Sequence, residues 1–364
     1  MKIAEIIETI EKFAPIPYQE PYDNSGLIIG DRMAICTGVL LCIDTIEAVV
    51  EEAIAKKCNL IVAHHPIIFS GLKQITGKNY IERVVLKAIK NDIAIYACHT
   101  NLDNVQLGVN AIIADKLGLI NRKILDPKKK VLKKLFTYIP KKNKDELLNA
   151  LFAAGAGHIG NYSECSYSIS GMGTYKGNDS SNPVIGERNI RSTELEEKIE
   201  VVFPFYLENA VLNALQNNHP YEEIAYEIIT LDNSYQEVGA GLLGELKTPM
   251  EEEDFLQLVK TKMMTKCIRH TALRKQKIHK VALCGGAGSF LLPNAIARNA
   301  DIFITGDFKY HQFFDADNQI VIADIGHYES EQFTVQLFNK ILSEKFINFA
   351  VQISTINTNP INYI

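Results

Sequence analysis

Short apolar runs alternate with amphipathic stretches through the first 118 residues of the chain. The runs with the length of buried strands lie at 34–44, 58–66 and 92–103. The stretches with apolar residues at helical spacing lie at 45–58, 79–91 and 101–119. Strands and helices in this rhythm form βαβ units around a mostly parallel sheet. In such a sheet, ligands bind beyond the carboxyl ends of the strands.

The pattern changes after Gly118. Residues 121–131 are polar and basic and include Pro127, which indicates a linker. The stretch from there to residue 234 predicts elements in the order β-α-β-β-α-β, with a loop rich in Gly, Asn and Ser at 177–182. This order is the ferredoxin-like pattern of an inserted α+β domain.

From about Tyr235 the alternation of strands and helices returns, and residues 328–345 predict one long helix. The two outer stretches therefore look like halves of a single sheet domain. We expect this α/β domain to comprise residues 1–127 and 235–364, and the insert to comprise residues 128–234.

The composition narrows the class of protein. Of the 364 residues, 47% are hydrophobic and 22% charged, as in globular proteins. The net charge of -5 disfavours a dedicated nucleic-acid binder, so Lys128–Lys130 is interpreted as a solvated linker. The seven cysteines form no C-x-x-C pair, which favours a reducing compartment. Residues 1–15 carry acidic side chains unlike a secretory signal, and no apolar run reaches membrane-spanning length, so we expect a cytoplasmic protein.

Polar residues follow two of the predicted strands in the first half. His64 and His65 end one strand, and Pro66 bends the chain, so both imidazoles can face one crevice and bind two metals. The alternative is a pair of histidines that caps a loop. Asp103 follows the next strand as a metal ligand or as a helix N-cap, and His99 lies four residues before it as a candidate acid or base.

The most informative segment is DIGHYESE, in which a strand ends and a helix begins. His327 and Glu331 are four residues apart, so they share one face of that helix and can grip a metal. The alternative is an exposed pair at a helix start. We favour the metal site because all three segments lie at the carboxyl ends of strands in the predicted sheet.

Together these segments supply three His, one Asp and one Glu. Five nitrogen and oxygen ligands exceed what one tetrahedral zinc takes, and they suit two divalent ions that share a carboxylate. We expect two divalent ions per chain, with zinc first and Mn, Fe, Co or Ni also compatible with such ligands.

Two further segments carry weaker signals. In TGDFKYH, Asp307, Lys309 and His311 follow a strand and can reach a substrate or support a metal ligand. In CGGAGS, the amides of Gly286 and Gly288 can cradle a phosphate between a strand and a helix, although such turns equally serve tight packing. The signatures H-E-x-x-H and G-x-S-x-G are absent, which excludes a zincin and an α/β-hydrolase.

Six segments in this order resemble the Nif-three-like family, whose members carry the name GTP cyclohydrolase I type 2 homologue. They are YDNSGLIIG, AHHPIIF, CHTNLD, CGGAGS, TGDFKYH and DIGHYESE, with Tyr22 where the family commonly has Trp. The resemblance implies a two-lobed sheet domain with helices on both faces and an insert similar to PII and CutA proteins. It also implies a toroidal homohexamer whose metal sites face an internal cavity. The metal ligands that it implies are His64, His65, Asp103, His327 and a bridging Glu331.

The resemblance implies a hydrolase that opens the purine ring of a nucleotide, with GTP as the named substrate. His99 or His311 would transfer protons, since histidine titrates near neutral pH. Asn24, Lys309, Gly286 and Gly288 would bind the substrate. The alternative is a non-enzymatic ring that stores or delivers metal, or a scaffold whose insert senses a small ligand. A third hypothesis, a ring around DNA, is disfavoured by the charge of -5.

Overall fold

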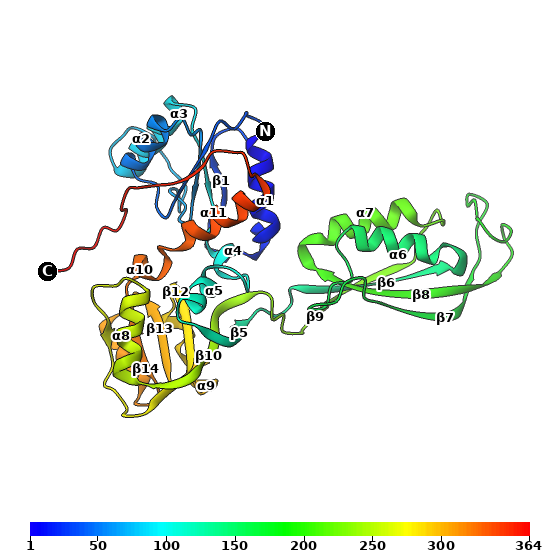
Figure 1. Ribbon diagram of the computed structural model, residues 1–364. Helices are drawn as coiled ribbons and strands as arrows, with labels where there is room; N and C mark the ends of the chain where they lie inside the picture. Colours follow the sequence, from blue (N-terminus) through cyan, green and yellow to red (C-terminus); the bar gives the residue numbers. More distant parts are fainter. The chain divides into compact units, whose positions relative to one another are not determined.

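The computed structural model describes all 364 residues (Figure 1). The chain divides into two compact units, one made of Met1–Pro127 with Gln236–Ile364 and the other of Lys128–Tyr235. Each unit has a hydrophobic core of its own. None of the helices combines the length and the apolar character that a membrane crossing requires.

The first unit contains a five-stranded sheet that is parallel except at one edge. Its strands, in spatial order, are β1 (Gly26–Ile29), β4 (Ala94–Ala97), β3 (Leu60–Ala63), β2 (Val39–Cys42) and β15 (Val351–Ile353). The helices that cover it are α1 (Ile3–Phe13), α2 (Glu47–Ala55), α3 (Tyr80–Lys90) and α11 (Thr334–Lys345). Every residue of β2, β3 and β4 is buried, as in a sheet covered on both faces.

A second sheet of six strands lies in the same unit. Its strands, in spatial order, are β11 (Arg269–His270), β14 (Val321–Asp324), β13 (Ile302–Gly306), β12 (Lys277–Ala287), β10 (Gly239–Glu251) and β5 (Leu119–Pro127). The helices around it are α5 (Val109–Lys116), α8 (Glu252–Lys262), α9 (Leu292–Ala297) and α10 (His327–Glu331). Strands β12, β13 and β14 are parallel, so their carboxyl ends meet at one edge.

The expectation of one sheet is therefore wrong. The outer stretches build two sheets, and each stretch gives one strand to the sheet of the other: β5 pairs with β10, and β15 pairs with β2. Hydrophobic periodicity reports that a segment is a strand, but it does not report which distant strand becomes its neighbour.

Two local predictions are also wrong. The predicted linker overlaps β5, an edge strand in which Leu119, Ile124 and Leu125 are buried while charged residues face outward. An edge strand tolerates such polarity because half of its surroundings are solvent. The predicted long helix is divided into α10 and α11, and this division separates the two sheets' helices.

The insert has one four-stranded antiparallel sheet with the spatial order β7-β8-β6-β9. Its elements along the chain are β6 (Leu132–Pro140), α6 (Lys144–Ala153), β7 (Ser166–Tyr175), β8 (Ser192–Pro204), α7 (Glu208–Asn218) and β9 (Tyr226–Leu231). The order is β-α-β-β-α-β, as the sequence pattern predicts. Both helices pack on the sheet through a core that includes Leu147, Leu151, Val211 and Leu215.

Candidate metal centre

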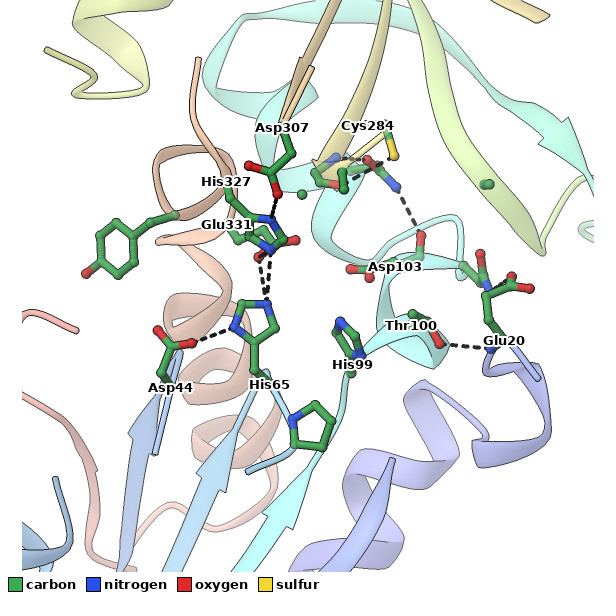
Figure 2. A pocket seen from close by; sticks show the side chains of 18 of the residues that line it. Glu20, Asp44, His65, His99, Thr100, Asp103, Cys284, Asp307, His327 and Glu331 are labelled. Atoms are coloured by element: carbon green, nitrogen blue, oxygen red, sulfur yellow. Dashed lines mark hydrogen bonds and ion pairs between the residues drawn. The ribbon is translucent and has the colours of Figure 1, made fainter. Parts of the chain in front are cut away.

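The candidate site lies where the strand ends of the two sheets converge in the first unit. His64 and His65 directly follow β3, and Asp103 ends the short helix α4 (Thr100–Asp103) after β4. From the second sheet, β14 leads through Gly326 into α10, which carries His327 and Glu331. Figure 2 shows His65, His327 and Glu331 pointing toward one another.

Three side chains form the first group of potential ligands. Glu331 Oε2 lies 3.0 Å from His65 Nε2 and 3.1 Å from His327 Nε2. The two imidazole nitrogens are 3.3 Å apart. All three atoms thus face one small volume, and the four-residue spacing of His327 and Glu331 brings them together on α10.

A second group uses the other oxygen of the same carboxylate. His64 Nε2 lies 3.7 Å from Glu331 Oε1 and 3.6 Å from Asp103 Oδ1. Oε2 of Glu331 therefore faces the first group, and Oε1 faces the second. A carboxylate with one oxygen facing each group could bridge two ions.

Several polar atoms of this cluster are buried without a hydrogen-bond partner, namely His64 Nε2, Asp103 Oδ1 and Glu331 Oε2. Burying such atoms without a partner is costly, because the water that they lose is not replaced. Atoms of His64, His65 and Glu331 lie within 4.8 Å of one another, close enough to hold one ion. The donor set of imidazoles and carboxylates fits divalent metals.

The outer nitrogen of each imidazole is held by an acceptor. Nδ1 of His64 is 2.9 Å from the carbonyl oxygen of Cys98, and Nδ1 of His65 is 2.7 Å from Asp44 Oδ1. Nδ1 of His327 is likewise 2.7 Å from Asp307 Oδ2. Since these oxygens only accept, each Nδ1 carries the hydrogen in the neutral ring, and the lone pair of Nε2 faces inward, as metal-binding histidines require.

The electrostatics of the cluster favour a cation. Burial raises the pKa of Glu331, but His327 and His64 outweigh it and hold that pKa well below its usual range. Burial lowers the pKa of His65 and His327, but the carboxylates beside them raise it to about 10 and about 11. Burial and the charge of Glu331 raise the pKa of Asp103 to about 7. A divalent ion competes with protons for these same atoms.

A cavity of about 610 Å³ opens beside the cluster. Its wall includes the rings of Tyr22, Phe69 and Phe290, and the carboxylates of Glu20, Asp44, Asp103, Asp307 and Glu331. No lysine or arginine lines it. Anionic groups of a ligand would therefore find no lysine or arginine in this chain's cavity.

Of the other predicted residues, His99 and Gly286 line this cavity. His99 Nδ1 is 2.7 Å from Asp23 Oδ1, which leaves Nε2 available. His311 is exposed, with its ring against Tyr310 and Phe314.

Asn24, Lys309 and Gly288 do not line the cavity. The Asn24 amide donates to the carbonyl oxygen of Ile68 at 2.6 Å, and Lys309 is exposed.

The glycine-rich segment Cys284–Ser289 was expected to bind a phosphate through its backbone amides, but the structure gives those amides other partners. The amide of Gly286 donates to Ser330 Oγ and that of Gly288 to Thr305 Oγ1, both at 2.9 Å. Those amides are therefore already used within the protein. A Cβ on Gly286 would lie 2.4 Å from Glu331 Oε1, so the glycine makes room for the shared carboxylate.

Two acidic residues were not predicted from the sequence. Asp44 follows β2 and supports His65, so the same rule of strand ends applies to it. Asp23 supports His99 and also accepts a hydrogen bond from the backbone amide of Thr100 at 3.0 Å. Asp23 lies in a loop before β1, where no strand pattern marks it.

The fold and the cluster define a class of α/β protein that has a candidate metal centre between two sheets. The family model Duf34/NIF3 (NGG1p interacting factor 3) matches residues 1–360, and the chain belongs to this family. This confirms the resemblance found in the sequence.

Relatives match over nearly the full length. A Bacillus subtilis protein named GTP cyclohydrolase 1 type 2 homolog is 37% identical over 365 residues, covering 99% of this chain and 98% of that protein. A Staphylococcus aureus protein of the same name is 35% identical over 369 residues, covering 100% of both. The crystal structure of a Bacillus cereus protein related to NIF3 has a TM-score of 0.86 and 36% identity, covering 100% of this chain and 99% of that one.

Proposed function

We propose that this chain is a metal-dependent hydrolase that holds two divalent ions, with zinc as the first expectation. The observation that carries the proposal is the division of Glu331 between two ligand groups, one with His65 and His327 and one with His64 and Asp103. Divalent ions in such a centre supply Lewis acidity and lower the pKa of water.

The remaining residues of the cavity orient the substrate and move protons. His99, held at Nδ1 by Asp23, presents Nε2 for proton transfer, whereas exposed His311 is the weaker candidate for this role. The rings of Tyr22 and Phe69, 6.3 Å apart, offer a surface for a planar heterocycle.

The more specific proposal is that the substrate is GTP, and the name of the relatives supports it. One water would add at C8 of the purine and open the imidazole ring to a formamide, and a second water would hydrolyse the formamide and release C8 as formate. Five carboxylates and no lysine or arginine line the cavity, so the lining disfavours a triphosphate, and bound metals would have to offset most of its charge. Guanosine is therefore the matched comparison substrate.

The second candidate is a non-enzymatic ring that stores metal, or a scaffold whose insert, similar to PII and CutA proteins, senses a ligand. The family resemblance supports a homohexamer for either candidate. The seven cysteines, all unpaired, support a reducing compartment such as the cytoplasm.

Elemental analysis tests the metal centre. After chelation and reconstitution with Zn, Mn, Fe, Co or Ni, we expect about two ions per wild-type chain. Glu331→Ala removes the shared ligand and should lose both ions with the circular dichroism spectrum unchanged. His279→Ala, at an exposed position on β12, is the control and should keep both. Full metal content in Glu331→Ala would contradict the bridging role.

A turnover assay with each reconstituted protein tests the reaction. Metal-dependent release of formate from GTP supports the cyclohydrolase, and release from guanosine alone keeps the hydrolase but discards the triphosphate. Two ions with no turnover of either substrate would favour the metal-storage candidate.

A further inference from the structure

A second cavity, of about 700 Å³, lies wholly within the insert. Strands β6, β7 and β8, the loop after β7 and the turn after α7 form its wall. It is separate from the residues of the candidate metal centre, so whatever it binds is independent of the proposed hydrolase.

A buried carboxylate stands in the wall of this cavity. Glu196 on β8 is 9% exposed, and it accepts a hydrogen bond from the Tyr221 hydroxyl at 2.8 Å. No lysine, arginine or histidine forms an ion pair with it. A buried carboxylate with one neutral donor lacks the counter-charge that such groups normally have.

The local backbone is shaped around this carboxylate. A Cβ on Gly173 would lie 2.0 Å from Glu196 Oε2, so a glycine on the paired strand β7 leaves the space that the carboxylate occupies. Any larger residue at 173 would displace Glu196 from its position in the wall.

His219 is close to this group, but it does not supply the missing charge. Its Nε2 is 3.0 Å from the carbonyl oxygen of Tyr138, and its Nδ1 accepts from the amide of Tyr221 at 3.2 Å. One nitrogen donates and the other accepts, which defines the neutral ring. Burial also lowers the pKa of His219.

Aromatic rings complete the wall. Tyr138, Tyr175 and Tyr221 all line the cavity, and the last two have ring centroids 6.2 Å apart. The Tyr175 hydroxyl donates to the carbonyl oxygen of Ile185 at 2.6 Å, which fixes the ring against the loop. Tyrosine faces beside a carboxylate are the surroundings that stabilise an organic ammonium group.

The charged side chains around the cavity also favour a cation. Glu222 and Glu223 line it together with Glu196, and Lys176 is the single basic residue among the lining residues. Glu222 also accepts from the backbone amide of Asn182 at 2.7 Å, so it ties the loop to the turn after α7.

We propose that this cavity binds a small organic ammonium ion, with Glu196 as its counter-charge and the tyrosine rings around its apolar part. Both shape and charge select the ligand. The tyrosine rings contact the alkyl groups of a compact organic ammonium ion, and the carboxylate disfavours an uncharged or anionic ligand of the same shape.

Titration calorimetry with the full chain tests this proposal, using choline and its uncharged isostere 3,3-dimethylbutan-1-ol. We expect saturable choline binding at least about tenfold tighter than binding of the alcohol, as one desolvated charge interaction gives. Glu196→Gln should weaken choline binding about tenfold or more, and Tyr175→Leu should weaken it with the carboxylate intact. Glu146→Gln, at an exposed position on α6, should leave it unchanged.

Three results would overturn the proposal. They are equal binding of choline and the alcohol, choline binding that Glu196→Gln does not weaken in a folded protein, and no binding of choline or ethylammonium. Binding of Mg²⁺ by the same residues, without a response to either ammonium ion, would assign the cavity to an inorganic cation instead. All four results are measurements of binding to the insert, so they do not depend on turnover at the candidate metal centre.

Discussion

Single hydrogen bonds at the outer nitrogens determine what the imidazoles of the candidate metal centre can do. Each Nδ1 meets an oxygen that cannot donate, so in the neutral ring the lone pair of Nε2 faces the volume that it shares with the carboxylate oxygens of Glu331 or Asp103, where a cation would lie. The side chains that fix the rings, Asp44 and Asp307, come from strand ends in different sheets. Both sheets therefore contribute the side chains that orient the imidazole rings, just as both contribute the candidate ligands.

Asp44 is the clearest test of this orientation. Asp44→Ala removes the acceptor of His65 Nδ1, and we expect metal affinity to fall by roughly 10–100-fold. Asp44→Asn keeps an acceptor oxygen without the charge and should lose less. Dissociation constants for Zn²⁺, measured by competition with a chelator, give the comparison.

The control for this series is Asp145→Ala, an exposed change on α6 in the insert. Unchanged affinity in both Asp44 variants would mean that the ring of His65 is held by packing alone.

At this scale the sequence pattern pointed to side chains that the structure brings close together, and the reason is physical. His64, His65 and Asp103 follow strands of one sheet, and His327 and Glu331 follow a strand of the other, so the rule of carboxyl ends applied to all of them. The rule did not extend to Lys309 and His311. They follow β13, but the chain turns outward there and leaves both side chains exposed.

Among the elements, the end of β12 and the helix α10 depend on each other. Gly286 has φ of 64° and lies against Glu331, so a side chain at 286 meets both backbone strain and the carboxylate. We expect Gly286→Ala to weaken metal binding by about tenfold or more, because it displaces a shared ligand.

Gly118→Ala is the matched control, since Gly118 has φ of 69° and open space around its Cβ position. It should lower stability by about 1 kcal/mol through the same backbone strain and leave metal binding unchanged. Equal metal affinity in the two alanine variants would show that Gly286 serves the turn alone.

Another element-scale contact fixes the end of the chain to the first sheet. Glu52 on α2 accepts from the amide and hydroxyl of Thr355 at 2.9 and 2.8 Å, and from the Ser354 hydroxyl. Further along, Thr358 donates to Asp44 at 2.7 Å, and residues 359–361 line the cavity of the metal centre. Anchoring at Glu52 therefore affects the wall of the site.

The contact should depend on pH. Burial raises the pKa of Glu52, but hydrogen bonds from Lys56, Ser354 and Thr355 outweigh it and lower that pKa to about 2. A lowered pKa stabilises the folded state above the usual value of 4.5, and this stabilisation is lost as the pH falls toward 2. Glu52→Gln should lower Tm by roughly 2–5 °C at pH 6, with a difference that narrows below pH 4.5.

Thermal unfolding of both proteins between pH 6 and pH 3 checks this expectation. A constant difference in Tm across that range would mean that the charge of Glu52 does not anchor the segment. Glu51→Gln, on the same helix but paired only with Lys87, provides the comparison.

Element types were predicted better than element partners. Strands such as β3 and β4 are fully buried and read as continuous apolar runs, whereas β5 has four exposed residues among its nine and resembled a linker. The exchange of β5 and β15 between the sheets depends on contacts between residues far apart in the sequence. Such contacts leave no periodic signal.

In the whole molecule, the insert joins the first unit through two chain segments that already lie together. β5 and β10 pair with Pro127 opposite Gly239, and the amide of Tyr235 donates to the carbonyl oxygen of Lys128 at 2.9 Å. The ends of the insert therefore meet as the ends of a hairpin would. A unit inserted at such a point, with a core of its own, can be removed without opening the sheet.

Replacing residues 129–234 by Asn-Gly should give a folded protein, since this dipeptide favours the tight turn of a two-residue hairpin. We expect the shortened protein to keep the metal content of the full chain, because all five proposed ligands lie outside the insert. It should also lose choline binding, so metal analysis and calorimetry of the same shortened protein separate the two sites. A folded, shortened protein that binds no metal would show that the insert supports the centre, and retained choline binding would place that ligand outside the insert.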